Sequence, residues 1–306
     1  MNLARIPEER RPCLLVLGAR GQVGWELVRT LASLGEVRAL DHASLDLTDT
    51  VAIRAVIGAI APGVIINAAA YTQVDRAETE PTIAHRVNGD APGILAAEAA
   101  RSGALLIHYS TDYVFDGTGS QPYTERDLPG PRTVYGASKL RGDQAVLERG
   151  VEAYVFRVGW VYGRRGRNFL NTIQRLARER EELSVVGDQH GGPTWSRAIA
   201  RATARAVELW LRSRRDGSAA PARGIYHMAP PDHTTWHGFA SEIIDALPMP
   251  DARKRPQVKS ISSVEYPTLA VRPAWSVLDA RLLREAFGLQ LPPWRTQLSR
   301  CMGGGA

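Results

Sequence analysis

Cysteine and long apolar runs are scarce in this sequence, and their scarcity excludes several classes of protein. The 306 residues include two cysteines, Cys13 and Cys301, which are too few for a disulfide framework or a cysteine zinc site. Of the seven histidines, His233 and His237 alone have HxxxH spacing, and the segment is not the HExxH of a zinc enzyme, so no zinc motif is evident either. No apolar run approaches the length of a membrane span, and residues 1–12 lack the apolar region of a secretory signal. We therefore expect a cytoplasmic protein that holds no zinc and does not enter a membrane.

Clustered positive charge is missing as well. The formal net charge is +6, but the arginines are spread along the whole chain rather than gathered in a stripe. This pattern argues against nucleic-acid binding, whereas an excess of basic residues suits ligands that carry phosphate. The 44% of hydrophobic and 23% of charged residues are those of an ordinary globular protein, long enough for one large core or two smaller ones.

What the sequence does contain begins with a glycine-rich turn. The apolar run 13–17 leads into this turn, and a helical pattern follows from 25 to 34. In a strand, turn and helix of this kind, glycines allow a tight turn, a close approach to a diphosphate, and close packing of the helix on the strand. We predict that the turn binds a dinucleotide; the alternative is a glycine turn with a structural role only. The predicted contacts are Gly18, Arg20, Gly21, Gln22, Val23 and Gly24.

Two features near this turn favour different nicotinamide cofactors. Asp41 and Asp46 follow the next predicted strand, 36–40, and an acid at this place can bind the adenosine ribose of NADH. Arg20, inside the turn, can instead bind the 2′-phosphate of NADPH. We therefore predict NADPH or NADH as the cofactor, with Asp41, Asp46 and Leu47 among its contacts. The preference between the two stays open.

Apolar runs alternate with helical patterns through the first half of the chain. The runs 64–66, 104–109 and 153–158 are almost wholly apolar, as in strands buried on both faces of a parallel sheet. The predicted fold is α/β: a Rossmann-type, doubly wound parallel sheet over residues 1–163 and a smaller α/β substrate-binding part over residues 164–306. A strand near 224–230 is expected to return to the main sheet. Three small residues after the run 64–66 are predicted to let the cofactor lie against the backbone: Ala68, Ala69 and Ala70.

A tyrosine and a lysine four residues apart, Tyr135 and Lys139, follow the sequence Ser110-Thr111-Asp112. On a helix the two side chains lie on the same face, so the ammonium can lower the phenol pKa from its reference value of about 10. Ser110-Thr111-Asp112 is expected at the carboxyl end of a strand, where ligands of open α/β sheets bind. A glycine turn, Ser-Thr-Asp and YxxxK follow one another as a nicotinamide-dependent short-chain reductase requires.

These motifs resemble the dTDP-4-dehydrorhamnose reductases of the extended short-chain dehydrogenase/reductase superfamily. The resemblance is carried by segments spread over nearly the whole chain: 18–27, 67–78, 108–117, 134–140, 160–162, 168–169, 187–194 and 272–273. It implies hydride transfer from NADPH or NADH to the 4-keto carbon of dTDP-4-dehydro-β-L-rhamnose. The product would be dTDP-L-rhamnose for surface polysaccharide.

The resemblance also implies roles for single residues. Tyr135 would protonate the oxygen at C4, Lys139 would hold the nicotinamide ribose, and Thr111 would donate a hydrogen bond to the same oxygen. The substrate-binding residues would be Asp112, Trp160, Asn168 and Arg272. Plainer interpretations stay open for each: caps of a turn for Thr111 and Asp112, a core position for Trp160, and a structural ion pair for Arg272.

Some questions remain open at this point. The regulatory subunit of methionine adenosyltransferase resembles these reductases without being one, and reductases or epimerases of other dTDP-deoxysugars share the same triad. Glu26 matches a glutamate that helps some relatives bind magnesium across a dimer interface, but the segment 195–197 lacks the expected acidic partner. Magnesium is therefore uncertain, and a homodimer is one option. Val-Gly at 158–159 replaces small hydroxyl residues of relatives, which leaves the hydrogen bonds to the substrate there undecided.

Overall fold

A six-stranded parallel sheet forms the centre of the molecule. The computed structural model describes residues 11–248 and 255–303. The strands run in the order β10-β5-β4-β3-β1-β2, and every pair of neighbours is parallel. Because β2 and β3 lie on opposite sides of β1, the sheet is doubly wound, and the fold prediction is confirmed. Its strands are β1 (Cys13–Leu17), β2 (Glu36–Leu40), β3 (Val64–Asn67), β4 (Leu105–Thr111), β5 (Ala153–Val158) and β10 (Gly224–His227).

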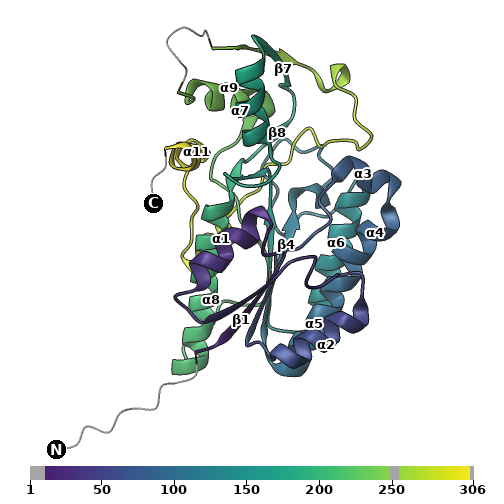
Figure 1. Ribbon diagram of the computed structural model, residues 1–306, viewed down its shortest axis with the longest axis vertical. Helices are drawn as coiled ribbons and strands as arrows, with labels where there is room; N and C mark the ends of the chain where they lie inside the picture. The colour runs from purple at the N-terminus through teal and green to yellow at the C-terminus, as the bar shows by residue number, and fades with distance from the viewer. Residues whose placement is uncertain (1–10, 249–254, 304–306) are drawn as a thin grey trace, which may run out of the picture.

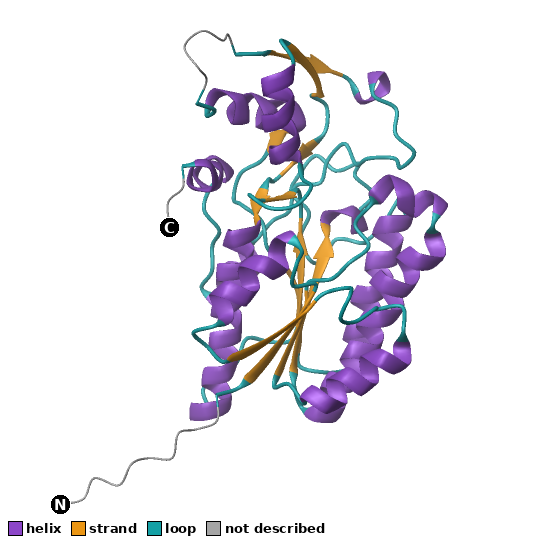
Figure 2. Ribbon diagram, in the orientation of Figure 1, coloured by secondary structure: helices purple, strands orange, loops and turns teal. Residues whose placement is uncertain are grey.

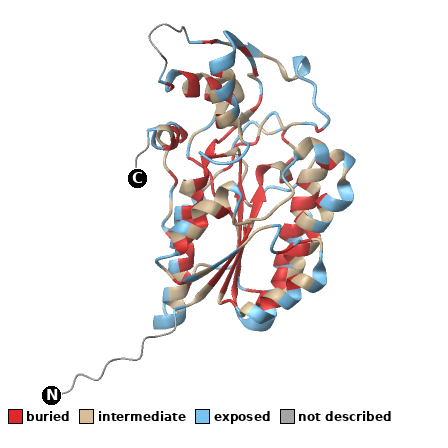
Figure 3. Ribbon diagram, in the orientation of Figure 1, coloured by how far each residue is buried: buried red, intermediate tan, exposed pale blue. Residues whose placement is uncertain are grey.

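Helices cover both faces of this sheet (Figure 1). On one side lie α1 (Gln22–Leu31) and α8 (Ser196–Asp216), and on the other lie α2 (Thr50–Ile60), α5 (Ala91–Ser102) and α6 (Val134–Glu148). Successive strand residues point to opposite faces. Leu14 therefore packs in one core and Leu15 in the other, both fully buried. Figure 3 shows this burial along the central strands, which explains why their sequences are apolar throughout.

The long helix α8 is a difference from the sequence prediction, which assigned most of 164–306 to the substrate part. It packs against α1 and adds Ile199, Val207 and Trp210 to the core on that side of the sheet. Four alanines on the same helix are buried there, and their small side chains let α8 approach closely. The strand β10 pairs with β5 at the edge of the sheet. Residues 196–227 thus contribute a helix and a strand to the half of the molecule that contains the central sheet.

Short helical elements follow the two middle strands of the sheet, β3 and β4. The chain after β3 forms α3 (Val74–Thr79), α4 (Pro81–His85) and the π-helical turn η1 (Arg86–Asp90) before α5. The chain after β4 enters the 3₁₀ turn η2 (Asp112–Val114). These segments start at the carboxyl ends of their strands, where open α/β sheets bind ligands.

A second, smaller part lies beyond the carboxyl ends of the strands, toward which the arrows in Figure 2 point. Its core includes Phe239, Ile243, Trp294 and Leu298. The helices are α7 (Phe169–Glu179), α9 (Trp236–Asp245) and α11 (Trp294–Met302), with the 3₁₀ turn η3 (Ser263–Glu265). The helix α10 (Arg281–Phe287) instead packs on β10 and α8 in the sheet half. The strand pairs are β6 (Val161–Tyr162) with β9 (Thr194–Trp195), β7 (Glu182–Val186) with β12 (Gln257–Ile261), and β8 (His190–Gly191) with β11 (Thr234–Thr235). None of the helices in the described ranges is both long and apolar enough to cross a bilayer.

Candidate active site

Thr111 and Asp112 lie where β4 ends. The Thr111 hydroxyl donates to Asp112 Oδ1 at 2.9 Å and accepts from the Tyr113 amide at 3.2 Å. Both side chains are buried, yet Asp112 Oδ2 has no hydrogen-bond partner among the described residues. A Cβ on Gly159 would lie 2.8 Å from this oxygen, so glycine leaves room for the carboxylate. Thr111 therefore does cap the turn, while Asp112 keeps one oxygen free for a ligand hydroxyl.

Burial changes the charge state of Asp112. It raises the pKa of the carboxyl to about 6, and the nearby Ser276 hydroxyl, then the Thr111 hydroxyl, oppose part of the rise. At neutral pH the group is mostly an acceptor, with one oxygen unpaired within the described part of the chain. Such an oxygen is a strong attractor for a sugar hydroxyl.

Tyr135 stands in the first turn of α6. The helix starts there because the Thr133 hydroxyl caps it, accepting from the Gly136 amide at 3.0 Å. The Tyr135 ring packs edge-on against Tyr113, with 5.7 Å between centroids. Burial raises the pKa of the Tyr135 phenol, and hydrogen bonding with Thr111 opposes part of this rise. The end of β4 and the start of α6 thus bring Thr111 and Tyr135 together.

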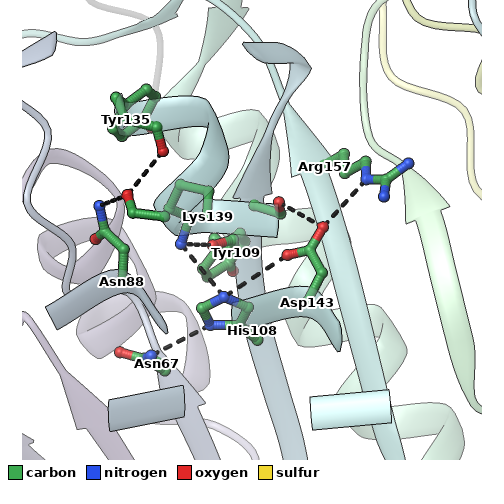
Figure 4. Close-up of polar contacts among 10 residues, drawn as sticks. Asn67, Asn88, His108, Tyr109, Tyr135, Lys139, Asp143 and Arg157 are labelled. Atoms are coloured by element: carbon green, nitrogen blue, oxygen red, sulfur yellow. Dashed lines mark hydrogen bonds and ion pairs between the residues drawn. The ribbon is translucent and has the colours of Figure 1, made fainter. Parts of the chain in front are cut away.

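Lys139 is buried, and its ammonium points to the backbone of β4 (Figure 4). Nζ donates to the Tyr109 carbonyl at 2.5 Å and lies 3.3 Å from His108 Nε2. Burial lowers the pKa of Lys139 to about 8, although the Asp143 carboxylate opposes the change. In the described structure, burial of the phenol outweighs any lowering of the Tyr135 pKa by this ammonium, which donates to the Tyr109 carbonyl. The lowering expected from the sequence stays a prediction for the complex with the cofactor.

The glycine turn lies against the small residues that follow β3. Gly18 has a φ of +75°, and a Cβ on it would lie 2.7 Å from the Ala69 amide nitrogen. A Cβ on Gly24 would lie 2.1 Å from the Gly18 oxygen. No side chain caps the first turn of α1, so its N–H groups face the turn as an anion site. The turn therefore fits the diphosphate of a dinucleotide. The predicted residues near it are Gly21, its N-cap, Gln22 and Val23, which open α1, and Ala68 and Ala70, which flank Ala69.

The two conflicting cofactor signals form a single ion pair at the end of β2. Arg20 Nε lies 2.7 Å from Asp41 Oδ2, with the arginine side chain 85% and the aspartate 15% exposed. Asp41 Oδ1 also accepts from the amide and hydroxyl of Ser44, and these bonds lower the pKa of Asp41. The carboxylate is therefore fixed, and the guanidinium is free to turn. Asp46 accepts from the Thr48 amide in the turn before α2, while Leu47 is buried in the core.

Trp160 follows β5 in a strained conformation. Its φ is 47°, which is uncommon for a residue other than glycine. The ring stacks on Trp236, with 3.5 Å between centroids and planes 2° apart. A Cβ on Gly191 would lie 2.3 Å from Trp160 Cε2. Packing of the Trp160 ring on Trp236 and Gly191 holds its backbone at this positive φ. The residue lies at the junction of the sheet and the smaller part.

Asn168 and Arg272 are tied to the sheet half by side-chain contacts. Asn168 caps α7, and its amide donates to Gln22 Oε1 at 2.9 Å, which places it beside the glycine turn. Arg272 Nη2 lies 2.5 Å from Asp75 Oδ2, and Nη1 donates to the Tyr113 hydroxyl at 3.2 Å. Tyr113 in turn packs against Tyr135. Arg272 thus forms the ion pair of the plainer interpretation and is also near the predicted acid.

A comparison with known protein families identifies the group to which the sequence belongs. The family described as the RmlD substrate binding domain matches residues 12–304. The chain belongs to the RmlD family. Two curated relatives are named dTDP-4-dehydrorhamnose reductase. The one from Burkholderia thailandensis is 47% identical over 94% of this chain and 97% of its own length, and the one from Salmonella typhimurium is 38% identical over 94% and 96%.

Solved structures place the RmlD family fold among related enzymes. A dTDP-4-dehydrorhamnose reductase from Bacillus anthracis, crystallised in complex with NADP, superimposes with a TM-score of 0.87 at 33% identity, over 96% of this chain and 99% of that one. The UDP-glucose 4-epimerase of Thermotoga maritima has a TM-score of 0.76 at 18% identity, over 95% and 97%. The second likeness shows the shared fold alone.

Several polar residues at this RmlD-family site escape the sequence motifs. His108 lies in the apolar strand β4 and is 1% exposed, and Asp143 lies one turn after Lys139 on α6 and is equally buried. Arg157 on β5 is also buried, with Nε 3.2 Å from Asp143 Oδ2. The available signal was polarity inside apolar runs, since a buried ionisable residue needs a partner. Asp75, which holds Arg272, carried no such signal because it lies in a short, polar helix.

Magnesium does not fit the residues that the resemblance to relatives points to. Glu26 Oε2 accepts from Arg197 Nε at 3.0 Å, so an arginine already neutralises the carboxylate. The described ranges contain no group of three or more His, Cys, Asp or Glu side chains that could hold a metal ion. In this RmlD-family chain, the Arg197 guanidinium therefore supplies the positive charge beside Glu26 that a magnesium ion would otherwise supply.

Proposed function

We propose that this protein reduces the 4-keto group of dTDP-4-dehydro-β-L-rhamnose to give dTDP-L-rhamnose, with NADPH or NADH as the reductant. Membership of the RmlD family and relatives named for this reaction support the proposal. The observation that carries it is local: the end of β4 and the start of α6 bring the Thr111 hydroxyl near enough to Tyr135 to influence the phenol pKa, beside a buried Asp112 carboxylate with one oxygen unpaired among the described residues.

The reduced nicotinamide, when bound, supplies the hydride. Tyr135 donates its phenolic proton to the oxygen at C4. The Thr111 hydroxyl, whose proton points to Asp112 Oδ1 in the described structure, turns to donate a hydrogen bond to the same oxygen. Asp112 Oδ2 accepts from a sugar hydroxyl, which orients the ring. In this scheme Lys139 holds the ribose next to the nicotinamide. The proposed substrate therefore receives one hydride and one proton at its carbonyl group.

The raised pKa of Tyr135 suits the direction of the reaction. Reduction of a ketone needs an acid that still carries its proton at neutral pH. Burial keeps the phenol protonated, with Thr111 in hydrogen-bonding contact. Before turnover the acid is therefore fully in its donating form, whereas a phenol with a lowered pKa would have lost part of its protons.

The glycine turn is the proposed cofactor site. Gly18, Gly21 and Gly24 would hold the diphosphate at the start of α1, and Arg20 with Asp41 would bind the adenosine ribose or its phosphate. A relative crystallised with NADP and a fold neighbour crystallised with NAD support either cofactor. The full set of proposed cofactor contacts also includes Gln22, Val23, Asp46, Leu47, Ala68, Ala69, Ala70, Tyr135 and Lys139.

The smaller part is the proposed substrate-binding half. Trp160, Asn168 and Arg272 lie at its junction with the sheet, where the sugar nucleotide would reach the cofactor. We propose a division into a cofactor-binding part, residues 1–163, and a mainly substrate-binding part, residues 164–306. Within the second range, α8 and β10 pack with the central sheet of the first. Three expectations stay predictions: a homodimer, no binding of nucleic acid, and a cytoplasmic location. Light scattering on the purified protein measures the oligomeric state.

The decisive experiment measures oxidation of NADPH and NADH by purified protein with dTDP-4-dehydro-β-L-rhamnose. We expect turnover with a dTDP-L-rhamnose product, identified by NMR of the sugar. Tyr135→Phe removes the acid and should lower the rate by about 10²–10⁴-fold. Tyr226→Phe, which removes a hydroxyl bonded only to a backbone carbonyl in the described structure, is the matched control and should keep its activity.

Two results would contradict the proposal. Full activity of the Tyr135→Phe protein would exclude this tyrosine as the acid. No oxidation of either cofactor with any dTDP-4-keto sugar would favour a non-catalytic protein such as the regulatory subunit of methionine adenosyltransferase. A product of different stereochemistry would instead identify another dTDP-deoxysugar reductase or an epimerase.

A further inference from the structure

Behind Lys139 lies a closed set of polar side chains for which the proposed reaction has no role yet (Figure 4). His108 on β4 and Asp143 on α6 each have 1% of their surface exposed, and Lys139 has 2%. Asn67 at the end of β3 is equally buried. Burying so many polar groups is unfavourable unless they satisfy one another, so their hydrogen bonds are informative.

The amide of Asn67 determines which nitrogen of His108 carries the proton. Asn67 Oδ1 accepts from the Ala69 amide at 3.3 Å, so the amide nitrogen is the atom that faces His108 Nδ1, at 3.2 Å. An amide NH₂ group can only donate. His108 Nδ1 must therefore accept, and the proton of the neutral ring lies on Nε2. The ring is neutral because burial, and then the Lys139 charge, lowers the pKa of His108 well below its usual value.

The Nε2–H group of His108 faces two different atoms. Lys139 Nζ lies at 3.3 Å and Asp143 Oδ1 at 4.0 Å. An ammonium has donors only, so it cannot accept from Nε2–H, whereas a neutral amine has a lone pair that can. The contact with Nζ is therefore a hydrogen bond only after Lys139 has lost its proton.

Asp143 supplies the other acceptor. Its Oδ2 accepts from the Ser110 hydroxyl at 2.8 Å and from Arg157 Nε at 3.2 Å. Its Oδ1 has no hydrogen-bond partner among the residues that the structure describes. A small rotation of the imidazole or of the carboxylate would close the 4.0 Å gap to His108 Nε2. The buried Oδ1 is thus a reserve acceptor for the imidazole proton.

We propose that His108 is a positioning residue for Lys139 that changes its hydrogen-bond acceptor with the charge of the lysine. When Lys139 is an ammonium, His108 Nε2–H donates to Asp143 Oδ1, and Nζ donates to the Tyr109 carbonyl. When Lys139 is a neutral amine, His108 donates to Nζ instead. Both charge states of a buried lysine are then satisfied, and Lys139 can lose and regain a proton without leaving a buried lone pair unpaired.

This inference rests on the proposed function, because the reduction is the reaction that requires Lys139 to lose a proton. Each turnover removes one proton from Tyr135 and transfers it to the alkoxide, which leaves a phenolate. The phenolate regains a proton from the Lys139 ammonium, and an acid of the solvent, hydronium or protonated buffer, restores the ammonium, so that each turnover consumes one solvent proton and the protein returns to its starting state. No electrons move in these two transfers. The lysine must therefore be stable as an amine for part of each cycle, and His108 makes it so.

The charged and titratable groups near Lys139 come from three elements. His108 and the Tyr109 carbonyl belong to β4, Asp143 and Tyr135 belong to α6, and Arg157 of β5 lies beyond Asp143. The Asp143 carboxylate favours the ammonium, whereas His108 Nε2–H favours the amine. Removing these two groups should therefore shift the titration of Lys139 in opposite directions.

The chain offers a direct way to observe that titration, because it contains only three lysines, Lys139, Lys254 and Lys259. In protein labelled with ¹⁵N at the lysine side chains, Lys254→Arg and Lys259→Arg variants assign the Lys139 signal. We expect a midpoint near the pKa of about 8 that burial gives Lys139. His108→Phe removes the donor and should raise this midpoint by about one pH unit, while Asp143→Asn should lower it.

Two further variants separate positioning from mere packing. In His108→Gln, the amide oxygen can accept from Asn67 and the NH₂ group can donate to Lys139, so the midpoint should return toward that of the unchanged protein. His237→Phe, a matched change in α9, where the imidazole meets only the Val258 carbonyl in the described structure, should leave the midpoint where it is. With substrate and NADPH, the alkaline limb of the kcat profile should move with the Lys139 midpoint.

The histidine tautomer can be read from ¹⁵N NMR of the unchanged protein, which avoids any folding defect of a variant. His108 should have a protonated Nε2 and an unprotonated Nδ1. A proton on Nδ1 would overturn the inference, and so would a Lys139 midpoint that is the same in folded His108→Phe protein. Neither measurement needs substrate. A protein that fails as a reductase but shows both signatures therefore refutes the proposed function alone.

Discussion

At the scale of single residues, the site is built from polar groups whose normal ionisation is changed by burial. Tyr135 and Asp112 keep their protons to a higher pH than they would in water, and Lys139 loses its proton more easily. All three shifts have desolvation as their largest cause. The common origin matters, because burial keeps the Tyr135 phenol protonated but also makes it a weaker acid, an effect that Thr111 partly opposes.

Asp112 should make the stability of the protein depend on pH. Its pKa rises from 3.8 in the unfolded chain to about 6 in the folded one, so the folded state binds more protons between these values. Stability should therefore fall as the pH rises from about 4 to 6. Asp112→Asn should remove this loss and stabilise the protein by about 1–3 kcal/mol at pH 8 relative to pH 4, measured by urea unfolding. Equal pH dependence in both proteins would contradict the assignment.

Arg20 and Asp41 should together control the choice of cofactor. Arg20→Ala leaves the fixed carboxylate without its partner, which should repel a 2′-phosphate and weaken binding of NADPH about 10-fold or more relative to NADH. Asp41→Asn should shift the preference toward NADPH. Calorimetric titration with both cofactors measures the ratio without turnover. Arg175→Ala, in an exposed pair on α7, is the control and should leave the ratio unchanged.

At the scale of elements, the start of each helix explains where the functional groups stand. The sequence expects Tyr135 and Lys139 on one helix, and α6 begins at Val134 because the Thr133 hydroxyl caps it. Tyr135 therefore lies in the first turn of this helix. The signal available in the sequence was the threonine itself, since threonine is a common N-cap residue. Cap positions are difficult to predict from periodicity alone.

The closeness of α1 to the glycine turn gives a prediction with a natural control. Gly24→Ala places a Cβ 2.1 Å from the Gly18 oxygen, and the backbone has to move. We expect the free energy of unfolding to fall by about 1–3 kcal/mol and cofactor binding to weaken strongly. Gly58→Ala on α2 meets only the end of the Arg101 side chain, at 3.8 Å. It should stabilise the protein by about 0.5–1 kcal/mol.

Urea unfolding and fluorescence titration with NADPH measure both effects in the two alanine variants. Unchanged NADPH affinity in the Gly24→Ala protein would exclude the turn as the cofactor site. A loss of stability in Gly58→Ala as large as that in Gly24→Ala would show that helix packing in general, and not contact with the turn, is responsible.

At the scale of the whole molecule, an ion pair is one of several links between the C-terminal segment and the sheet half. Arg272 lies between η3 and α10, and Asp75 lies on α3. Asp75 Oδ1 also accepts from the Ala270 amide at 3.1 Å. Because Arg272 also donates to Tyr113, this link runs to the ring that packs against Tyr135, the proposed acid.

Variants of Asp75 and Arg272 should distinguish a structural role of Arg272 from a substrate-binding one. The pair is partly exposed, with side chains 42% and 26% accessible, so a double-mutant cycle on stability should give a coupling of only about 0.5–1 kcal/mol. Arg272→Met should also raise KM for the sugar nucleotide, whereas Asp75→Asn should not. Equal KM values in both variants would leave Arg272 with the structural role alone.

Much of the fold could be predicted because strands and helices leave local marks in a sequence. The buried strands of β1, β3, β4 and β5 are apolar runs, and the glycine turn identifies the first strand and helix by its own geometry. The predicted return of a strand near 224–230 agrees with the position of β10 beside β5. The packing of α8 on α1 was missed, since an amphipathic helix does not record in its sequence which of two layers it will cover.

The sequence by itself determined the order of the elements and supplied the proposals for the dinucleotide turn and the acid, because each depends on residues close together in the chain. Only the tertiary structure decided how these groups are charged and what they touch. It turned Lys139 toward the Tyr109 carbonyl and His108, raised the pKa of Tyr135, and joined Arg20 to Asp41 and Arg272 to Asp75. Desolvation and ion pairing depend on neighbours from distant segments, and no local pattern in a sequence contains them.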